Sequence, residues 1–408
     1  MNTLLIKIGK SWQVLKRDGF FNGFRRIFSA FFALFRFVGN GDILFISGGV
    51  GDSALYRTVH VAEELNFKGF KCSVTVQDNP RLVNYVDKFL VFVFHRTLYT
   101  SRVAKLINEI KKQNKTIIFD TDDLVYDPKY LNYMDYYKKM NSLEKRLYEN
   151  GVGGEILRDD YVKVATTTTN FLANKLKKEN KKVFVVPNKL SVVDVKNATE
   201  ALKSNNVSFR LKQSEVEKSQ NNRIKKDIIR LGYFSGTISH NKDFATITEP
   251  LMEIMKKYKN VELLLVGPLN VENELVQQFG DRIKQLSYVK RSKHFANIAK
   301  CDVNLAPLEY DNPFCKAKSE LKFFEAGIVK VPTVAVDNQT YSEAINDGVD
   351  GFLASNTEEW VDKLSQLIDD EELRIEMGKM AYNTTLCRYT TQSKNDNEYY
   401  KYLKDIIK

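Results

Sequence analysis

Residues 316–335, KAKSELKFFEAGIVKVPTVA, hold the side chains of this chain most suited to binding a sugar phosphate. Their pattern predicts a loop, a helix and a buried strand. Lys316, Lys318 and Ser319 offer donors to a phosphate just ahead of the helix, whose amino end itself attracts anions. Glu325, further along the helix, can accept hydrogen bonds from sugar hydroxyls. Diphosphate beside ribose is what a nucleotide-sugar presents. An ordinary amphipathic helix with solvated lysines would show the same composition.

Strands and helices alternate through both halves of the chain, which indicates parallel sheets. In the second half, Gly236 follows the apolar run 229–235, and Lys242 comes six residues later. Ligands of open α/β sheets bind beyond the carboxyl ends of the strands. We therefore expect residues 236–242 and 316–325 to lie at the same edge of one sheet.

The first half opens with a short apolar strand, residues 42–47, that runs into Gly48-Gly49-Val50-Gly51. Gly49 and Gly51 followed by Ala54 imitate a dinucleotide fingerprint, with Asp78 beyond the second strand as its acidic partner. A nicotinamide or flavin enzyme therefore stays open as an alternative.

The second half of the chain resembles the donor-binding segment of retaining GT-B glycosyltransferases, family 4 (glycosyl transferases group 1). Glu325-Ala326 followed by Val331-Pro332 matches the later part of that family's motif. In its earlier part the family has a glutamate where Ala317 stands here. A lysine- and serine-rich version of the motif is similar to residues 318–322.

The resemblance implies a GT-B fold, with two doubly wound Rossmann-like domains facing a cleft. It implies that Lys242, Glu325 and Asp122 take part in catalysis. The donor-binding residues that it implies are Gly236, Thr237, Lys242, Lys316, Lys318, Ser319 and Glu325. The residues that it places on the acceptor side are Gly49, Gly51, Tyr56, Arg57, His95, Arg96, Asp120, Asp122 and Asp123. Thr237 stands where the family often has an arginine.

Asp120-Thr121-Asp122-Asp123 contains an Asp-x-Asp, which holds a divalent metal in GT-A glycosyltransferases. Carboxylates do suit Mg²⁺ or Mn²⁺. A GT-A enzyme is one domain, however, whereas this chain has a second nucleotide-binding half. We therefore interpret the aspartates as acceptor hydroxyl ligands or a base, with no bound metal and no cofactor besides the nucleotide-sugar co-substrate. An Asx turn that caps a helix near Leu124 is the alternative.

The first 40 residues form a basic aromatic segment. They contain seven basic residues and one acidic residue, a charge of +6 out of the +11 of the whole chain, together with nine Phe and Trp residues. Such a composition suits an amphipathic helix in an anionic membrane interface. A basic helix packed on the protein itself is the alternative. No apolar run is long enough to span a bilayer. These features predict a cytoplasmic protein, peripheral on the inner face of the membrane.

The four cysteines, Cys72, Cys301, Cys315 and Cys387, are far apart, which argues against a disulfide framework or a zinc site. No basic stripe or nucleic-acid module follows the first segment. The expected organisation is the basic segment 1–40, an acceptor-side domain 41–190, a polar linker or surface excursion 191–228, a nucleotide-sugar domain 229–388, and a helix 389–408 returning to the first domain. The predicted function is sugar transfer to a glycan or lipid-linked glycan in bacterial-type surface polysaccharide or glycoconjugate synthesis. A non-catalytic scaffold is the other class that the departures at Ala317 and Thr237 leave open.

Overall fold

The computed structural model describes residues 24, 28, 31–134, 137–138, 140–146, 148–217, 228–236, 241–287, 289–395 and 397–407. The chain divides into two compact units, which we describe separately. Unit 1 is Met1–Lys189 with Asp396–Lys408, and unit 2 is Leu190–Asn395. Both are α/β units, as predicted.

Unit 1 contains a six-stranded sheet in which every strand pairs in parallel with its neighbours. In spatial order the strands are β2 (Cys72–Val76), β1 (Ile43–Ser47), β3 (Val91–His95), β4 (Thr116–Thr121), β5 (Val164–Thr167) and β6 (Lys182–Val185). β1 and β3 are buried along their whole length, which explains their apolar sequences. The strand order reverses between β1 and β3, and such a switch point is where open α/β sheets bind ligands.

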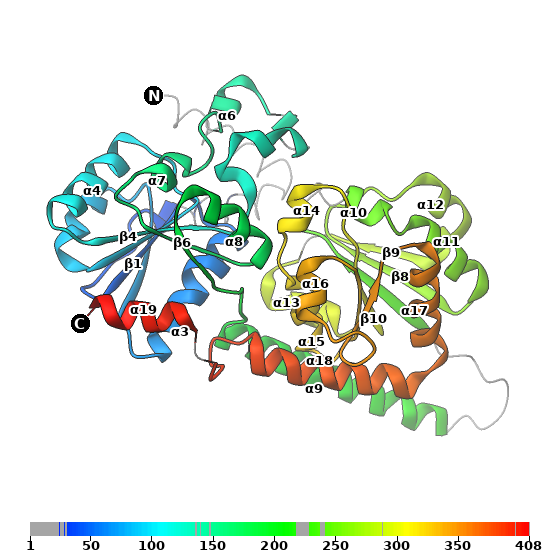
Figure 1. Cartoon of the computed structure of the whole chain (residues 1–408). Helices are drawn as coiled ribbons and strands as arrows, with labels where there is room; N and C mark the ends of the chain where they lie inside the picture. The colour runs from blue at the N-terminus through cyan, green and yellow to red at the C-terminus, as the bar shows by residue number, and fades with distance from the viewer. Residues whose placement is uncertain are drawn as a thin grey trace. The chain divides into compact units, whose positions relative to one another are not determined.

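Helices and short helical turns connect these strands (Figure 1). They are α2 (Asp52–Ala54), η1 (Leu55–His60), α3 (Val61–Phe67), η2 (Leu82–Lys88), α4 (Ser101–Lys112), η3 (Leu124–Tyr126), η4 (Pro128–Tyr133), α6 (Ser142–Arg146), α7 (Gly154–Arg158), α8 (Asn170–Leu176) and η5 (Lys177–Glu179). α2, η1 and α3 follow one another directly, and η1 is a π-helical stretch, a form that is frequent at functional sites.

The last helix, α19 (Glu398–Ile407), belongs to unit 1 (Figure 1, red). Tyr399, Tyr400 and Leu403 are buried in the hydrophobic core of this unit with Phe184 and Val186. The chain therefore leaves unit 1 after β6 and returns to it near its end.

Unit 2 contains a second parallel six-stranded sheet. In spatial order its strands are β12 (Phe352–Ala354), β11 (Thr333–Val336), β10 (Val303–Ala306), β7 (Ile229–Phe234), β8 (Val261–Val266) and β9 (Ile283–Leu286). The order reverses between β7 and β10, so this switch point lies beyond Phe234 and Ala306.

The helical segments of unit 2 begin with α9 (Val192–Glu217), which occupies most of the segment where the sequence suggested a polar linker. It contacts α13 (Arg291–Ile298). The others are α10 (Asn241–Ala245), α11 (Thr248–Lys257), α12 (Asn273–Phe279), η7 (Gly280–Arg282), α14 (Pro313–Ala317), α15 (Leu321–Gly327), α16 (Gln339–Ala344), α17 (Thr357–Asp369) and α18 (Glu371–Arg388).

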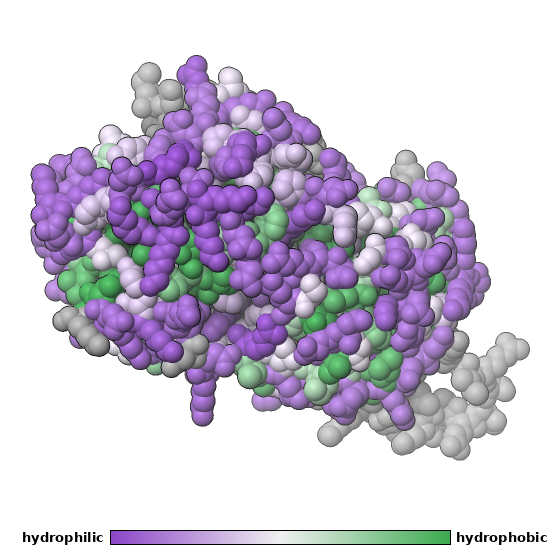
Figure 2. Space-filling model, in the orientation of Figure 1, coloured by the Kyte–Doolittle hydropathy of each residue, from purple (hydrophilic) through white to green (hydrophobic). Residues whose placement is uncertain are grey.

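Hydrophilic side chains cover most of the face shown in Figure 2, with smaller hydrophobic areas between them. The basic aromatic segment lies largely outside the described residues. Its described phenylalanines are more than half exposed, and they are Phe24, Phe28, Phe31, Phe32, Phe35 and Phe37. Within the described part of the chain, no helix is long and apolar enough to cross a membrane.

Candidate functional site

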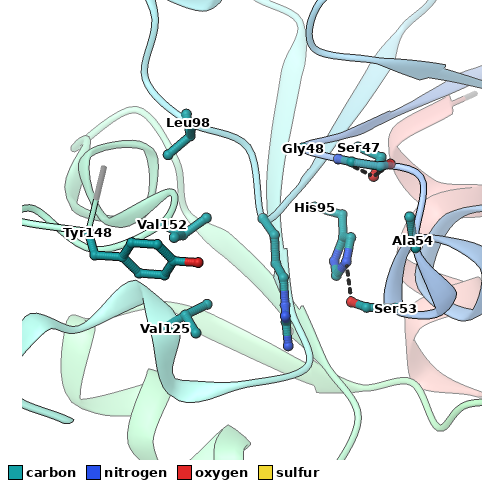
Figure 3. A pocket seen from close by; sticks show the side chains of 12 residues that line it. Ser47, Gly48, Ser53, Ala54, His95, Leu98, Val125, Tyr148 and Val152 are labelled. Atoms are coloured by element: carbon teal, nitrogen blue, oxygen red, sulfur yellow. Dashed lines mark hydrogen bonds between the residues drawn. The ribbon is translucent and has the colours of Figure 1, made fainter. Parts of the chain in front are cut away.

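Unit 1 has a cavity of about 230 Å³ at its switch point, beyond the carboxyl ends of β1 and β3. Its lining residues are Ser47, Gly48, Gly49, Gly51, Ser53, Ala54, His95, Arg96, Leu98, Val125, Tyr148 and Val152. Figure 3 shows His95 and Ser53 on one side of the cavity and Tyr148, Val125 and Val152 on the other. One wall is therefore polar and the opposite wall is largely apolar.

The glycines of the first loop have different roles. A Cβ at Gly48 would lie 1.9 Å from the carbonyl oxygen of Arg96, so this position requires glycine. A Cβ at Gly49 or Gly51 would meet nothing within 4 Å. The two glycines predicted on the acceptor side therefore leave open space over the backbone at the cavity.

A buried ion pair lies behind this cavity. Arg57 is 1% exposed, and its Nη2 and Nε contact the two carboxylate oxygens of Asp120 at 2.6 and 3.2 Å. Arg57 also donates from Nη1 to the carbonyl oxygen of Val186, and Thr166 donates its hydroxyl to Asp120 at 2.6 Å. Burial alone would raise the pKa of Asp120, but the charge of Arg57 and the hydrogen bond from His95 outweigh it and lower that pKa far below its usual range.

His95 joins this ion pair to the cavity. Its Nδ1 lies 2.7 Å from Asp120 and its Nε2 lies 2.9 Å from the hydroxyl of Ser53 (Figure 3). Because an ionised carboxylate only accepts, Nδ1 carries the proton. In the neutral ring, Nε2 is then an acceptor for a hydroxyl, and Ser53 takes that position here.

Arg96 follows His95 in a left-handed backbone conformation, with φ +43°, which is uncommon for a residue with a side chain. Its guanidinium pairs with Asp122 at 2.5 Å and with Asp123 at 3.1 Å. Burial alone would raise the pKa of Asp122. Nearby positive charge, mainly that of Arg96, outweighs burial, and the pKa is lowered. Asp123 also accepts from the backbone N–H of Leu124 at 2.7 Å, so the capping interaction considered from the sequence is present.

Besides Asp122 and Asp123, which pair with Arg96, the acceptor-side candidates fall into two groups. Gly49, Gly51, His95 and Arg96 line the cavity. Tyr56, Arg57 and Asp120 are at most 3% exposed and form the support behind it. The family resemblance placed these three on the acceptor side, and a buried arginine and aspartate are usual only where they are paired, as here.

In unit 2, lysines gather at the switch point beyond β7. Lys318, a predicted donor-site residue, pairs with the buried Asp243 at 2.5 Å. Lys242 precedes Asp243 on α10 and is exposed. The space around Gly236 is open. Thr237, another predicted donor-site residue, lies outside the described residues.

Of two further predicted residues, Lys316 lies on α14 and Ser319 lies between α14 and α15. The Nζ of Lys316 is 5.6 Å from the centre of the Tyr310 ring, and Ser319 is half-buried. The assignment of Lys316 and Ser319 to the donor site stays a prediction.

Lys322 is a site candidate that sequence reasoning did not select. Its Nζ donates at 2.6 Å to the carbonyl oxygen of Phe234, the last residue of β7, and lies 4.9 Å from the centre of the Tyr233 ring. Burial, with a smaller contribution from the nearby charge of Lys318, lowers the pKa of Lys322 to about 8. Lys322 lies on α15, whereas Lys318 lies before this helix in extended backbone, so no helical spacing links the two lysines in the sequence.

Glu325 faces α13. Its carboxylate oxygens contact Arg291 Nη1 at 3.1 Å and His294 Nε2 at 3.0 Å, and its side chain is 13% exposed. Neither Arg291 nor His294 was predicted from the sequence, because they lie more than 30 residues before Glu325 with no motif linking them.

Among the described residues, Asp243, Glu309 and Cys315 could together offer ligands to a metal, with ligand atoms within 4.8 Å of one another. These groups already interact, since Cys315 donates to Asp243 at 3.1 Å and Lys318 pairs with the same carboxylate. Burial is also the main cause of a pKa of Cys315 well above its usual value, which opposes the thiolate that a metal requires. The set therefore fits a metal poorly.

Residues 229–370, within unit 2, match the family model described as glycosyl transferases group 1. No curated protein matches the chain.

Solved structures with the same fold cover most of this chain. Anabaena Alr3699/HepE in complex with UDP-glucose has 12% identity and a TM-score of 0.55, covering 90% of this chain and 99% of its own. A glycosyltransferase from Rickettsia africae has 13% identity and a TM-score of 0.57, covering 91% and 100%. Sucrose-phosphate synthase from Thermosynechococcus elongatus has 14% identity and a TM-score of 0.56, covering 86% and 95%. The predicted GT-B fold is thereby confirmed.

We expect Arg57→Met to lower the free energy of unfolding of unit 1 by about 3–5 kcal/mol, because it leaves the Asp120 charge buried without its partner. Hydrogen exchange of β3 and β4 peptides at increasing urea concentrations measures this unit separately. The double variant Arg57→Met/Asp120→Asn should recover part of the loss. Lys112→Gln, which breaks the exposed pair with Glu109, is the control and should cost less than about 1 kcal/mol. If Arg57→Met lowered the free energy of unfolding by as little as Lys112→Gln does, a stabilising role for the buried pair would be contradicted.

The lowered pKa of Lys322 predicts a pH-dependent stability. Between pH 8 and about 10, native Lys322 has released a proton that the unfolded chain, with a lysine pKa of about 10.4, still binds. The free energy of unfolding of the wild type relative to Lys322→Met should therefore rise over this range, by up to about 3 kcal/mol. Urea titrations at pH 7, 8, 9 and 10 measure it, with the exposed Lys256→Met as the charge control. A constant difference between wild type and Lys322→Met would show that Lys322 is not desolvated in the native state.

Proposed function

We propose that the chain is a glycosyltransferase that moves a sugar from a nucleoside diphosphate donor to a glycan or lipid-linked glycan, with retention of anomeric configuration. The observation that carries this proposal is the group of lysines at the carboxyl end of β7, inside the region that matches glycosyl transferases group 1. HepE, which shares the fold, was solved with UDP-glucose. We infer the same class of donor here, in bacterial-type surface polysaccharide or glycoconjugate synthesis.

The donor is assigned to unit 2. Transfer requires stabilisation of the departing diphosphate, which preorganised positive charge supplies. Lys322, on α15, bonds the last residue of β7 through its ammonium group. Lys318 is anchored by Asp243, and Lys242 is exposed on α10. Lys316 and Ser319 extend this set, and Glu325 is assigned to the ribose. No bound metal is needed for this charge balance.

The acceptor is assigned to the cavity of unit 1. An acceptor hydroxyl that displaced Ser53 would meet His95 Nε2, whose opposite nitrogen is held by Asp120. The carboxylate of Asp122 lies 3.9 Å from the same nitrogen and is a second hydroxyl ligand or base. The apolar wall of Tyr148, Val125 and Val152 suits the face of a sugar ring.

A non-catalytic scaffold with the same fold is the second candidate. Ala317 stands where the family has its first glutamate and is 1% exposed, so no carboxylate contacts a donor sugar from this position. A nicotinamide or flavin enzyme is the third candidate, and the experiment described next tests it together with the other two.

Thermal unfolding with UDP, GDP, dTDP and NAD tests these functions together. We expect one nucleoside diphosphate to stabilise the protein, by about 2.7 kcal/mol at 100 times its dissociation constant. Turnover of its sugar conjugate should persist in EDTA. Lys242→Ala and Glu325→Ala should each lower kcat/KM by about 10²–10³-fold, as for loss of a charged group at the transition state.

Lys256→Ala, at an exposed position of unit 2, is the control and should keep the wild-type kcat/KM. Stabilisation by NAD alone would support the dinucleotide alternative, and stabilisation by no nucleotide would support the scaffold. Wild-type turnover by a folded Glu325→Ala protein would remove Glu325 from the donor site.

We also propose that residues 1–36 attach the protein to the inner face of the cell membrane. The described part of this segment exposes Phe24, Phe28, Phe31, Phe32 and Phe35, and its sequence carries all seven basic residues of the first 40. Aromatic side chains and cations together favour an anionic lipid interface. Attachment would confine the enzyme and a lipid-linked acceptor to one surface.

Deleting residues 1–36 should release the protein from liposomes that contain anionic lipid and leave nucleotide binding unchanged. Binding of the full chain should weaken as salt rises, because charge attraction is screened over about 8–10 Å at physiological ionic strength. Cosedimentation at 50 and 500 mM salt measures both effects, with neutral phosphatidylcholine liposomes as the control. Continued cosedimentation of the truncated protein, or its failure to fold, would contradict the proposal.

A further inference from the structure

The carboxylate of Glu325 is held from one side by α13. Arg291 contacts one oxygen at 3.1 Å and His294 contacts the other at 3.0 Å. Because a carboxylate oxygen can accept more than one hydrogen bond, contacts from Arg291 and His294 orient the group and are compatible with a ligand hydroxyl on the same oxygens. The side chain also keeps 13% of its surface exposed.

Arg291 is itself anchored to a second carboxylate. Its Nε and Nη2 contact the two oxygens of Asp194 at 2.7 and 3.0 Å. The side chain of Asp194 is only 3% exposed, so this charge depends on the guanidinium for compensation. A planar guanidinium can bond one carboxylate with two nitrogens and reach another with the third, whereas an ammonium lacks that fork.

The first residues of α9 fix Asp194 in turn. The backbone N–H of Ser191 donates to Asp194 Oδ2 at 3.1 Å, and the backbone N–H of Asp194 donates to Ser191 Oγ at 3.1 Å. This reciprocal arrangement is a capping box, which defines the start of a helix. Asp194, Arg291 and Glu325 therefore form a continuous support from the backbone of α9 to α15.

We infer that Arg291 is a positioning residue that orients the Glu325 carboxylate to accept hydrogen bonds from the two ribose hydroxyls of the donor nucleotide. The inference rests on the proposed function, because it takes a nucleoside diphosphate as the ligand of unit 2. A carboxylate whose plane is set by Arg291 and His294 presents two acceptors to a vicinal diol. Without Arg291, Glu325 loses one of these two contacts, and the acceptors are no longer fixed as a pair.

Binding of UDP and of 2′,3′-dideoxy-UDP, measured by isothermal titration calorimetry, separates positioning from folding. Hydrogen bonds to a charged acceptor predict that the wild type prefers UDP by about 10–100-fold. Arg291→Gln should weaken UDP binding, leave 2′,3′-dideoxy-UDP binding nearly unchanged, and reduce the preference to about 3-fold or less. Arg291→Lys should keep only part of the wild-type preference for UDP. Arg230→Gln, which breaks the ion pair with Glu262 in the same unit, should keep the wild-type preference.

Asp194→Asn provides a second variant should Arg291→Gln fail to fold. It keeps the guanidinium and removes the charge that anchors it, and the preference should again fall. A wild type that prefers UDP, with folded Arg291 and Asp194 variants that keep the full preference, would overturn the positioning role alone. If GDP binds in place of UDP, the same comparison uses GDP and 2′,3′-dideoxy-GDP. A wild type that binds dTDP alone, which lacks the 2′-hydroxyl, would overturn this inference, and a wild type that binds none of UDP, GDP and dTDP would overturn the proposed function as well.

Discussion

The buried pair of Arg57 and Asp120 is the interaction on which the candidate site of unit 1 depends. Two charges removed from water are tolerated only when their hydrogen-bonding groups are satisfied. Here Arg57 also bonds the backbone after β6, and Asp120 accepts from Thr166 at the end of β5 and from His95 at the end of β3. The pair thus connects the ends of neighbouring strands to the helix after β1. His95 is held in one tautomer and orientation because the carboxylate that it faces cannot move.

The charged side chains at the switch point of unit 2 are arranged differently. Lys318 and Lys322 lie within reach of one buried carboxylate, Asp243, and Lys322 bonds a carbonyl oxygen. The lowered pKa of Lys322 reports the cost of removing its ammonium group from water. An anion bound there would relieve that cost. A diphosphate is such an anion, whereas the paired charges of unit 1 suit a neutral hydroxyl compound.

Much of the fold was predictable, because parallel strands buried on both faces read as apolar runs between helices. β1 and β7 were located within one residue in this way, as the runs 42–47 and 229–235. The turn after β1 was also evident, and its tightest glycine is the one that the carbonyl oxygen of Arg96 approaches. The long helix α9 was not predicted, since its mixed polar sequence has no clear apolar face in a helical period.

By itself the sequence determined the fold class and the segments that carry lysines, glycines and carboxylates to the ends of strands. Only the tertiary structure decided which of these side chains meet. It buried Tyr56 and Arg57 and exposed Lys242. It paired Glu325 with Arg291 and His294, and it aligned Asp194 with the same guanidinium. The physical reason is that strand order and helix packing set such pairings, and residues close in a folded sheet can be far apart in sequence without any local pattern to mark them.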